Sequence, residues 1–196
     1  GRRGAALTGL LADVEVVAGC FDQACAALAA GVVAEGSGFY GLGTTEALAL
    51  AMRHPNPALS RLNVAVIPHA VPGVLLGMSG SQTGGRLLRW CRDELCAEER
   101  LAATARGIDA YDLMLAGLTA DPGPLMILPH FAGSGSLDSD ADALGAILGL
   151  SFGTRRADIV KAVLEGVTYE QALSLLRLDA EGVSPARLAV VGGGAR

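Results

Sequence analysis

Short apolar segments with strand character alternate along the chain with segments of helical spacing, and glycine or proline turns separate them. Strands are expected over residues 15–18, in two runs within 37–52, and over 63–68, 74–78, 125–129, 145–150 and 188–191. Helices are expected over residues 23–33, 84–94, 98–107, 110–120 and 156–178. This mixture of elements predicts an α/β or α+β domain.

The helix expected over residues 156–178 has the strongest pattern. It carries an apolar stripe formed by Ile159, Val160, Val163, Leu164, Val167, Leu173 and Leu176. Thr154 stands just before it and is the predicted N-cap. A stripe of this kind predicts a helix that packs one face against the core.

Composition limits the classes of protein to consider. The chain has 196 residues, 51% of them hydrophobic, which allows one substantial core, or one domain plus part of another. The formal net charge is −5 and no basic stripe occurs, so nucleic-acid binding is not supported. No apolar run approaches the roughly 20 residues that span a bilayer, and no secretory leader is visible. We therefore expect a cytoplasmic protein without a membrane partner.

The four cysteines form two pairs with the same five-residue separation, Cys20 with Cys25 and Cys91 with Cys96. On one helix, the members of such a pair lie about 140° apart, which does not suit a shared metal ion. The sequence therefore predicts reduced, largely buried thiols and no metal site.

Asp22 follows an apolar segment and precedes a run of small residues with helical spacing. A carboxylate in this place is suited to accept a proton from an attacking hydroxyl group, and Gln23 beside it can hydrogen bond a substrate. The alternative, favoured by the local sequence alone, is that Asp22 merely caps the helix.

Three glycine turns are candidates for phosphate contacts. Gly43-Thr44-Thr45 offers close backbone approach and two hydroxyl groups, although an ordinary hairpin turn explains the same residues. Gly84-Gly85 opens a helix, where backbone N–H groups suit anions, and a flexible turn is the alternative. Gly192-Gly193-Gly194 follows a strand, as in many nucleotide-contacting turns. Glu46, directly after the first turn, is interpreted as no more than a charge at a strand edge.

In this order and spacing, the segments resemble the C-terminal half of an FGGY carbohydrate kinase. The matching segments are 6–10, 17–19 with Asp22 and Gln23, 43–46, 83–85 with 88–90, 145–150, 156–158, 162–167 and 190–195. The resemblance implies an actin-like ATPase (ribonuclease H-like) fold, mainly its C-terminal lobe and truncated at both ends. Residues 1–33 would be the remnant of the N-terminal domain, and residues 34–196 would be the C-terminal domain.

The resemblance also implies ATP-dependent phosphorylation of a sugar or polyol hydroxyl, with Mg²⁺ accompanying ATP. Asp22 falls on the catalytic base and, with Gln23, on the substrate site. Gly43, Thr44, Gly85 and Gly194 fall on nucleotide contacts. The oligomeric state stays open, a homo-oligomer included.

Two further expectations concern function. Because the first phosphate loop of the family is not seen in this sequence, the isolated fragment is expected to have little kinase activity. The competing hypothesis is a non-catalytic nucleotide-binding or regulatory module of the actin-like superfamily.

Overall fold

The computed structural model of the chain describes residues 2–11, 13–15 and 19–195. The helices are α1 (Arg2–Thr8), α2 (Asp22–Ala29), α3 (Pro57–Arg61), α4 (Gly84–Leu95), α5 (Ala97–Arg106), α6 (Ala110–Leu115) and α7 (Arg156–Ala180). The strands are β1 (Ser37–Leu42), β2 (Glu46–Met52), β3 (Ala65–Pro68), β4 (Leu75–Ser81), β5 (Met126–Leu128), β6 (Ala146–Leu148) and β7 (Arg187–Val191), and the 3-10 turn η1 (Gly193–Ala195) follows. The mixed α/β class is confirmed.

A five-stranded sheet in the order β3-β4-β2-β1-β7 forms the centre of the fold. Both predicted strand pairs are present and antiparallel, β1 with β2 and β3 with β4, because each pair is joined by a short turn. Strand β7 comes from the far end of the sequence and pairs with β1 in parallel. Because the pairing is parallel, β1 and β7 end at the same edge of the sheet, and each is followed there by a glycine turn.

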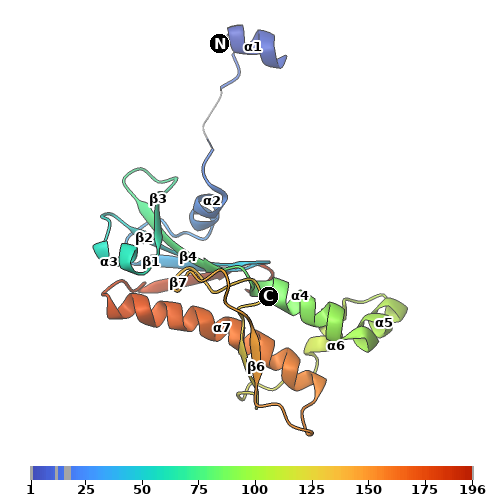
Figure 1. Cartoon of the computed structure of the whole chain (residues 1–196). Helices are drawn as coiled ribbons and strands as arrows, with labels where there is room; N and C mark the ends of the chain where they lie inside the picture. Colours follow the sequence, from blue (N-terminus) through green and yellow to red (C-terminus); the bar gives the residue numbers. More distant parts are fainter. Residues whose placement is uncertain (1, 12, 16–18, 196) are drawn as a thin grey trace.

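Helices cover both faces of the sheet (Figure 1). On one face, α2 contributes Ala24 and Ala27 to a cluster with Phe39 and Leu76. On the other face, Leu178 of α7 packs with Leu48 and Leu50 of β2 and with two residues that precede β3, Leu59 and Val64. The alternation of the strands fits this arrangement, since successive residues of β2 belong to opposite clusters.

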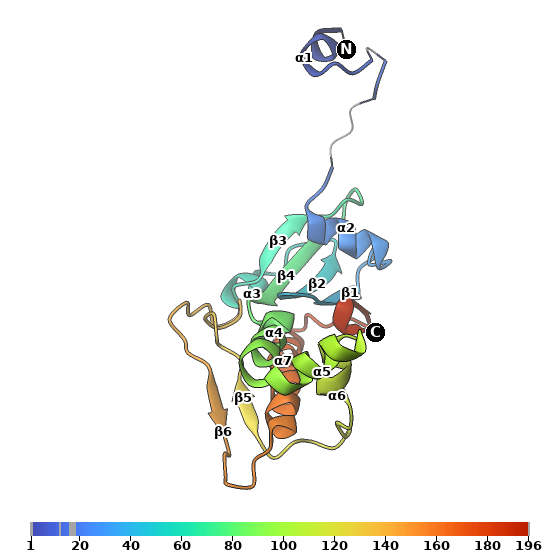
Figure 2. The same cartoon turned by 90° about the vertical axis from the view of Figure 1, so that its right-hand side faces the viewer.

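A third cluster lies beyond the sheet, where α4, α6, β5 and the first half of α7 meet (Figures 1 and 2). Val160 and Val163 of α7 pack there against Ile127 of β5. The approach is close because α7 carries Gly166 at the contact, and a Cβ at that position would stand 2.6 Å from the Ile127 carbonyl oxygen. The long helix therefore joins this part of the fold to the central sheet.

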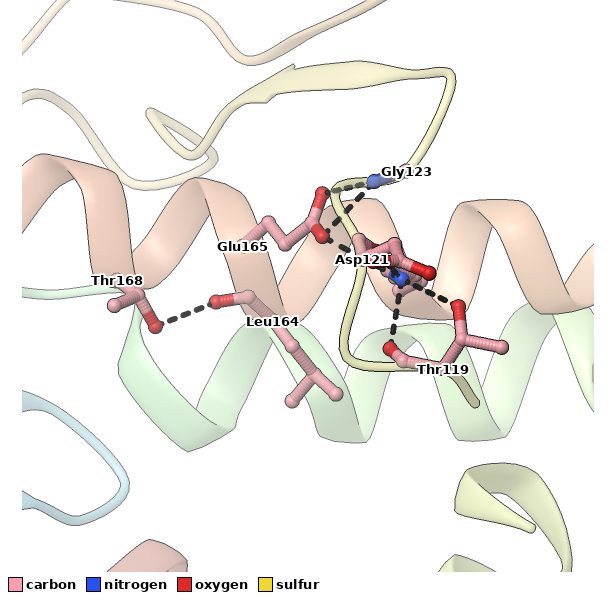
Figure 3. A network of polar contacts seen from close by, with 7 residues as sticks. Thr119, Asp121, Gly123, Leu164, Glu165 and Thr168 are labelled. Atoms are coloured by element: carbon pink, nitrogen blue, oxygen red, sulfur yellow. Dashed lines mark hydrogen bonds and ion pairs between the residues drawn. The ribbon is translucent and has the colours of Figure 1, made fainter. Parts of the chain in front are cut away.

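A buried polar network holds the turn before β5 against α7 (Figure 3). The ammonium group of Lys161 donates hydrogen bonds to the Thr119 carbonyl and hydroxyl oxygens and to the Asp121 carbonyl. Glu165 lies 3.8 Å from the Lys161 Nζ and accepts from the Gly123 N–H at 3.0 Å. This set of partners explains how a lysine that is 9% exposed is tolerated.

Several predicted boundaries are wrong. Helix α2 ends at Ala29, because Gly31 takes a left-handed conformation with φ of 72°. Helix α6 ends at Leu115 and not at residue 120, and Gly117 follows with φ of 80°. The strand expected over residues 15–18 falls mostly on residues 16–18, which lie outside the described part of the chain.

The predicted details of α7 also need correction. Arg155 and not Thr154 is the N-cap, and its N–H donates to the Asp158 carboxylate, while the Thr154 hydroxyl accepts from Ser151. Leu173 and Leu176 are exposed, so the apolar stripe is buried only in part. The helix turns these two leucines away from the sheet as it crosses it.

The prediction of reduced thiols is wrong for one cysteine pair. Cys20 and Cys25 form a disulfide, with Cα atoms 6.2 Å apart. Cys91 and Cys96 are free and fully buried, as predicted, but Cys96 lies past the last residue of α4, so the two do not share a helix. Burial raises the pKa of the Cys91 thiol to about 12.

Candidate functional site

The turn Gly43-Thr44-Thr45 forms the exposed tip of the β1–β2 hairpin. The last residue pair of the hairpin is Leu42 with Glu46, so the three turn residues project past the sheet. Both threonines therefore present backbone and hydroxyl groups at the surface. Such a tip has the donors that a phosphate group requires.

The start of α4 is tied to this hairpin. The Gly85 N–H donates to the Gly43 carbonyl oxygen at 2.8 Å, and the Arg86 N–H donates to the Thr44 carbonyl oxygen at 2.9 Å. A Cβ at Gly85 would stand 2.7 Å from that Gly43 oxygen, so only glycine permits the approach. The Gly85 N–H is thus already hydrogen bonded to the hairpin, and close packing explains why this position is a glycine.

The C-terminal glycine turn reaches the same place from β7. A Cβ at Gly192, whose φ is 106°, would stand 2.4 Å from the Leu42 carbonyl oxygen, and one at Gly194 would stand 3.1 Å from the Leu42 Cβ. Figure 1 shows the C-terminal turn and the start of α4 at one end of the central sheet. The three predicted glycine turns, 151 positions apart at their extremes in the chain (43 to 194), are therefore neighbours around the hairpin.

Asp22 lies on a different element from these turns. It is the first residue of α2, its side chain is exposed, and its Oδ1 accepts a hydrogen bond from the Gln23 N–H at 2.8 Å. No hydrogen bond between described residues joins Asp22 to the three glycine turns. As the first residue of the helix, Asp22 is not the N-cap, which is Phe21, and no side-chain cap hydrogen bond is present at this helix start.

A pocket of about 740 Å³ adjoins Asp22. It is lined by Gly19, Cys20, Phe21, Cys25 and residues 67–70. The disulfide brackets Asp22 in sequence and forms part of the wall. His69, at the far side, uses both ring nitrogens internally, with the Val32 carbonyl and the Val71 N–H, as expected of a structural histidine.

Glu46 is the residue whose environment differs most from the expectation. It is 3% exposed, and the Tyr40 hydroxyl donates a hydrogen bond to its Oε1. Burial raises the pKa of Glu46 to about 7; the Tyr40 hydrogen bond and the Gln171 amide act in the opposite direction, and the Glu170 carboxylate adds to the rise. Burial and Glu46 together raise the pKa of Tyr40 as well. The available signal was an acid at the head of a strand that is otherwise apolar.

Neither a metal cluster nor a membrane helix is found in the described ranges. Residues 2–11, 13–15 and 19–195 contain no group of three or more histidine, cysteine, aspartate or glutamate side chains suited to hold a metal ion. Within the same ranges, every helix is too short or too polar to cross a membrane.

The arrangement is that of an α/β lobe of the actin-like ATPase type, with three glycine turns at one end of its sheet. Residues 38–196 match the family model described as "FGGY family of carbohydrate kinases, C-terminal domain". The chain therefore belongs to the FGGY family of carbohydrate kinases, as the sequence resemblance predicted.

Known relatives agree with this assignment. A xylulose kinase of Staphylococcus epidermidis is 27% identical over 188 residues, and an autoinducer-2 kinase of Escherichia coli O9:H4 is 32% identical over 200 residues. These alignments cover 96% and 98% of this chain but only 36% and 37% of the relatives. The crystal structure of a xylulose kinase from Rhodospirillum rubrum superposes with a TM-score of 0.80 and 29% identity, covering the whole chain and 38% of that protein. The chain thus spans little more than a third of the length of the proteins it matches.

Proposed function

We propose that this chain is part of an ATP-dependent kinase that transfers the γ-phosphoryl group of ATP to a hydroxyl group of a sugar or polyol. The observation that carries the proposal is the convergence of the three glycine turns at the β1–β2 hairpin, where Gly85 and Gly192 would collide with the hairpin backbone if they bore side chains. Residues 34–196 would form the C-terminal domain, which the family match over 38–196 supports, and residues 1–33 would end the N-terminal domain.

In this proposal the nucleotide side is formed by Gly43 and Thr44 of the hairpin and by Gly194 of the C-terminal turn. Backbone N–H and threonine hydroxyl groups there would donate to phosphate oxygens. Gly85 would act by allowing α4 to support the hairpin, since its own amide is already bonded. Mg²⁺ bound with ATP would supply positive charge at the transferred phosphoryl group.

On the acceptor side, the Asp22 carboxylate would take the proton of the attacking hydroxyl group, and Gln23 would hydrogen bond the sugar. The exposed position of Asp22 beside an open pocket supports this role. Phosphoryl transfer depends mainly on positioning both reactants. We therefore propose that the whole enzyme works in the cytoplasm, where ATP is supplied, and that the 196-residue chain alone turns over little ATP.

The experiment compares Asp22→Ala with Asp109→Ala in the full-length protein, using ATP and a panel of pentoses, hexoses, sugar acids and polyols. Asp109 is a matched control, because it also accepts a backbone N–H at a helix start, from Tyr111 at 3.0 Å. Asp109 is the N-cap of α6, so its loss costs about 1 kcal/mol of stability, and loss of Asp22 from the first turn of α2 should cost no more than this. Only Asp22→Ala should lower sugar-dependent turnover, by several orders of magnitude, with ATP still bound.

Two results would contradict the proposal. Equal turnover in the two variants would leave Asp22 with a structural role only, in the first turn of α2. Absence of sugar-dependent turnover across the whole panel, with ATP bound, would favour the non-catalytic nucleotide-binding module.

A further inference from the structure

Glu46 is a buried acid without a positive partner. No ion pair among the described residues includes it. An ionised carboxylate in such a place is costly, because burial removes its hydration and no opposite charge replaces it. The groups that surround Glu46 therefore decide in which protonation state the fold accepts it.

Four elements pack around this carboxyl group, and none of them brings a cation. Strand β1 contributes the Tyr40 hydroxyl, α7 contributes the Gln171 amide and the acidic Glu170, and β4 contributes Ser81 as the cross-strand neighbour. Helix α4 contributes Gly84, where a Cβ would stand 2.6 Å from the Glu46 Cγ. Among the described residues, the only charged group that acts on Glu46 is thus the Glu170 carboxylate.

The hydrogen bonds indicate where a proton would reside. Tyr40 already donates to Oε1, whereas the buried Oε2 has no partner. The Gln171 Oε1, on the amide that approaches Glu46 from α7, is also buried without a donor. A hydrogen atom on the Glu46 Oε2 would supply a donor to a region that has two unpaired acceptors.

The Glu46 carboxyl group lies at the base of the Gly43-Thr44-Thr45 turn. Tyr40 and Glu46 are on the two strands that flank Gly43-Thr44-Thr45, so their hydrogen bond closes the base of the turn. On the other side, the turn rests on α4 through the bonds from the Gly85 and Arg86 amides. A change at Glu46 therefore acts on the geometry of the turn.

We propose that Glu46 is a positioning residue that holds the Gly43-Thr44-Thr45 turn against α4 and α7 as a neutral carboxylic acid, and that ionisation of Glu46 loosens the turn and weakens nucleotide binding. The second part rests on the proposed function of the turn. Ionisation draws water toward the carboxylate and adds repulsion from Glu170. The turn then becomes more mobile without any loss of the catalytic groups.

The first test is hydrogen–deuterium exchange of the full-length protein at pH 6 and pH 8, corrected for the intrinsic exchange rate. Because the pKa of Glu46 is raised to about 7 in the folded state, protection of residues 40–46 should fall as the pH rises toward that value and level off above it, by about tenfold in all between pH 6 and pH 8. Protection of residues 159–167 in α7 serves as the internal reference. In Glu46→Gln the fall should be absent, since the amide keeps the acceptor for Tyr40 and supplies an N–H donor in place of the proton.

An equal fall in Glu46→Gln and the wild type, or no fall in the wild type, would overturn the proposal. Tyr40→Phe provides an independent test if the first variant does not fold. The Tyr40 hydrogen bond lowers the pKa of Glu46, so its removal should move the loosening to higher pH. A loosening at unchanged pH in Tyr40→Phe would equally contradict the role given to Glu46.

The nucleotide part is tested by KM and kcat. The KM for ATP should rise several-fold from pH 6 to pH 8 in the wild type relative to Glu46→Gln, and the ratio of their kcat values should stay constant. Parallel KM profiles with a pH-dependent turn would remove nucleotide binding from the proposal. The kinase assignment would survive that result, because it is decided by Asp22→Ala and not by the pH profile.

Discussion

Gly85→Ala probes the contact between α4 and the hairpin, on which the proposed nucleotide site depends. The new methyl group would stand 2.7 Å from the Gly43 carbonyl oxygen and 3.8 Å from the Thr44 Cα. Both nearest groups belong to the backbone of the hairpin, so no side chain can rotate away. Helix α4 and the turn must separate by about 0.7 Å to reach ordinary van der Waals distance.

The cost follows from the atoms involved. Overpacking at a rigid contact costs about 1–3 kcal/mol. The separation also weakens the hydrogen bonds from the Gly85 and Arg86 amides, each contributing about 1 kcal/mol. Replacing glycine within a helix returns about 0.5–1 kcal/mol. The expected net loss of unfolding free energy is about 1–3 kcal/mol.

Urea unfolding followed by Trp90 fluorescence measures this loss. Trp90 is the only tryptophan of the chain and lies on α4, the helix that must move. With a slope of about 2 kcal/mol/M, the unfolding midpoint should fall by about 1 M. Gly4→Ala is the control, since a Cβ there meets no atom within 4 Å, and its midpoint should not fall. An unchanged or higher midpoint for Gly85→Ala would refute the close approach of hairpin and helix.

Three further outcomes are expected. Lys161→Met should lower the free energy of unfolding by about 3 kcal/mol, because two carbonyl oxygens lose their donor and the Glu165 carboxylate loses its ion-pair partner, and calorimetry will detect this as a lower Tm. Stability should also decline from pH 4.5 to pH 7 by up to about 3 kcal/mol, because the pKa of Glu46 is higher in the folded state than in the unfolded state. A pH series of unfolding curves should show this decline in the wild type and not in Glu46→Gln. Finally, the buried Cys91 and Cys96 should resist alkylation at pH 8 until the protein is unfolded. The exposed Cys20–Cys25 disulfide should yield two reactive thiols on reduction alone. Mass spectrometry of labelled peptides measures both outcomes.

Local signals in the sequence were sufficient for much of the fold. The strands around Gly43-Thr44-Thr45 and Pro72-Gly73 were predicted correctly, because turn residues and flanking apolar runs act over a few positions. Helix ends at Ala29 and Leu115 were predicted too far along the chain. Both helices stop before the left-handed glycines Gly31 and Gly117, because a glycine in this conformation ends a helix.

The candidate site also contains residues that local sequence predicts and residues that only tertiary contacts define. Gly43, Thr44 and Gly194 were selected from their turns, and the structure places those turns together. The role of Glu46 was not predicted, since its burial depends on Tyr40, Gly84 and α7, and α7 begins 110 positions later (46 to 156). Asp22 and Gln23 remain predictions that mutation must decide.

The order of residues thus specifies which segments turn, which are strands and to which family the chain belongs, because these properties depend on neighbours within a few positions. The meeting of the glycine turns and the protonated state proposed for Glu46 depend on contacts between distant segments. Packing creates those contacts, and with them the desolvation that changes the chemistry of a side chain, so they emerge only when the sheet and α7 have come together.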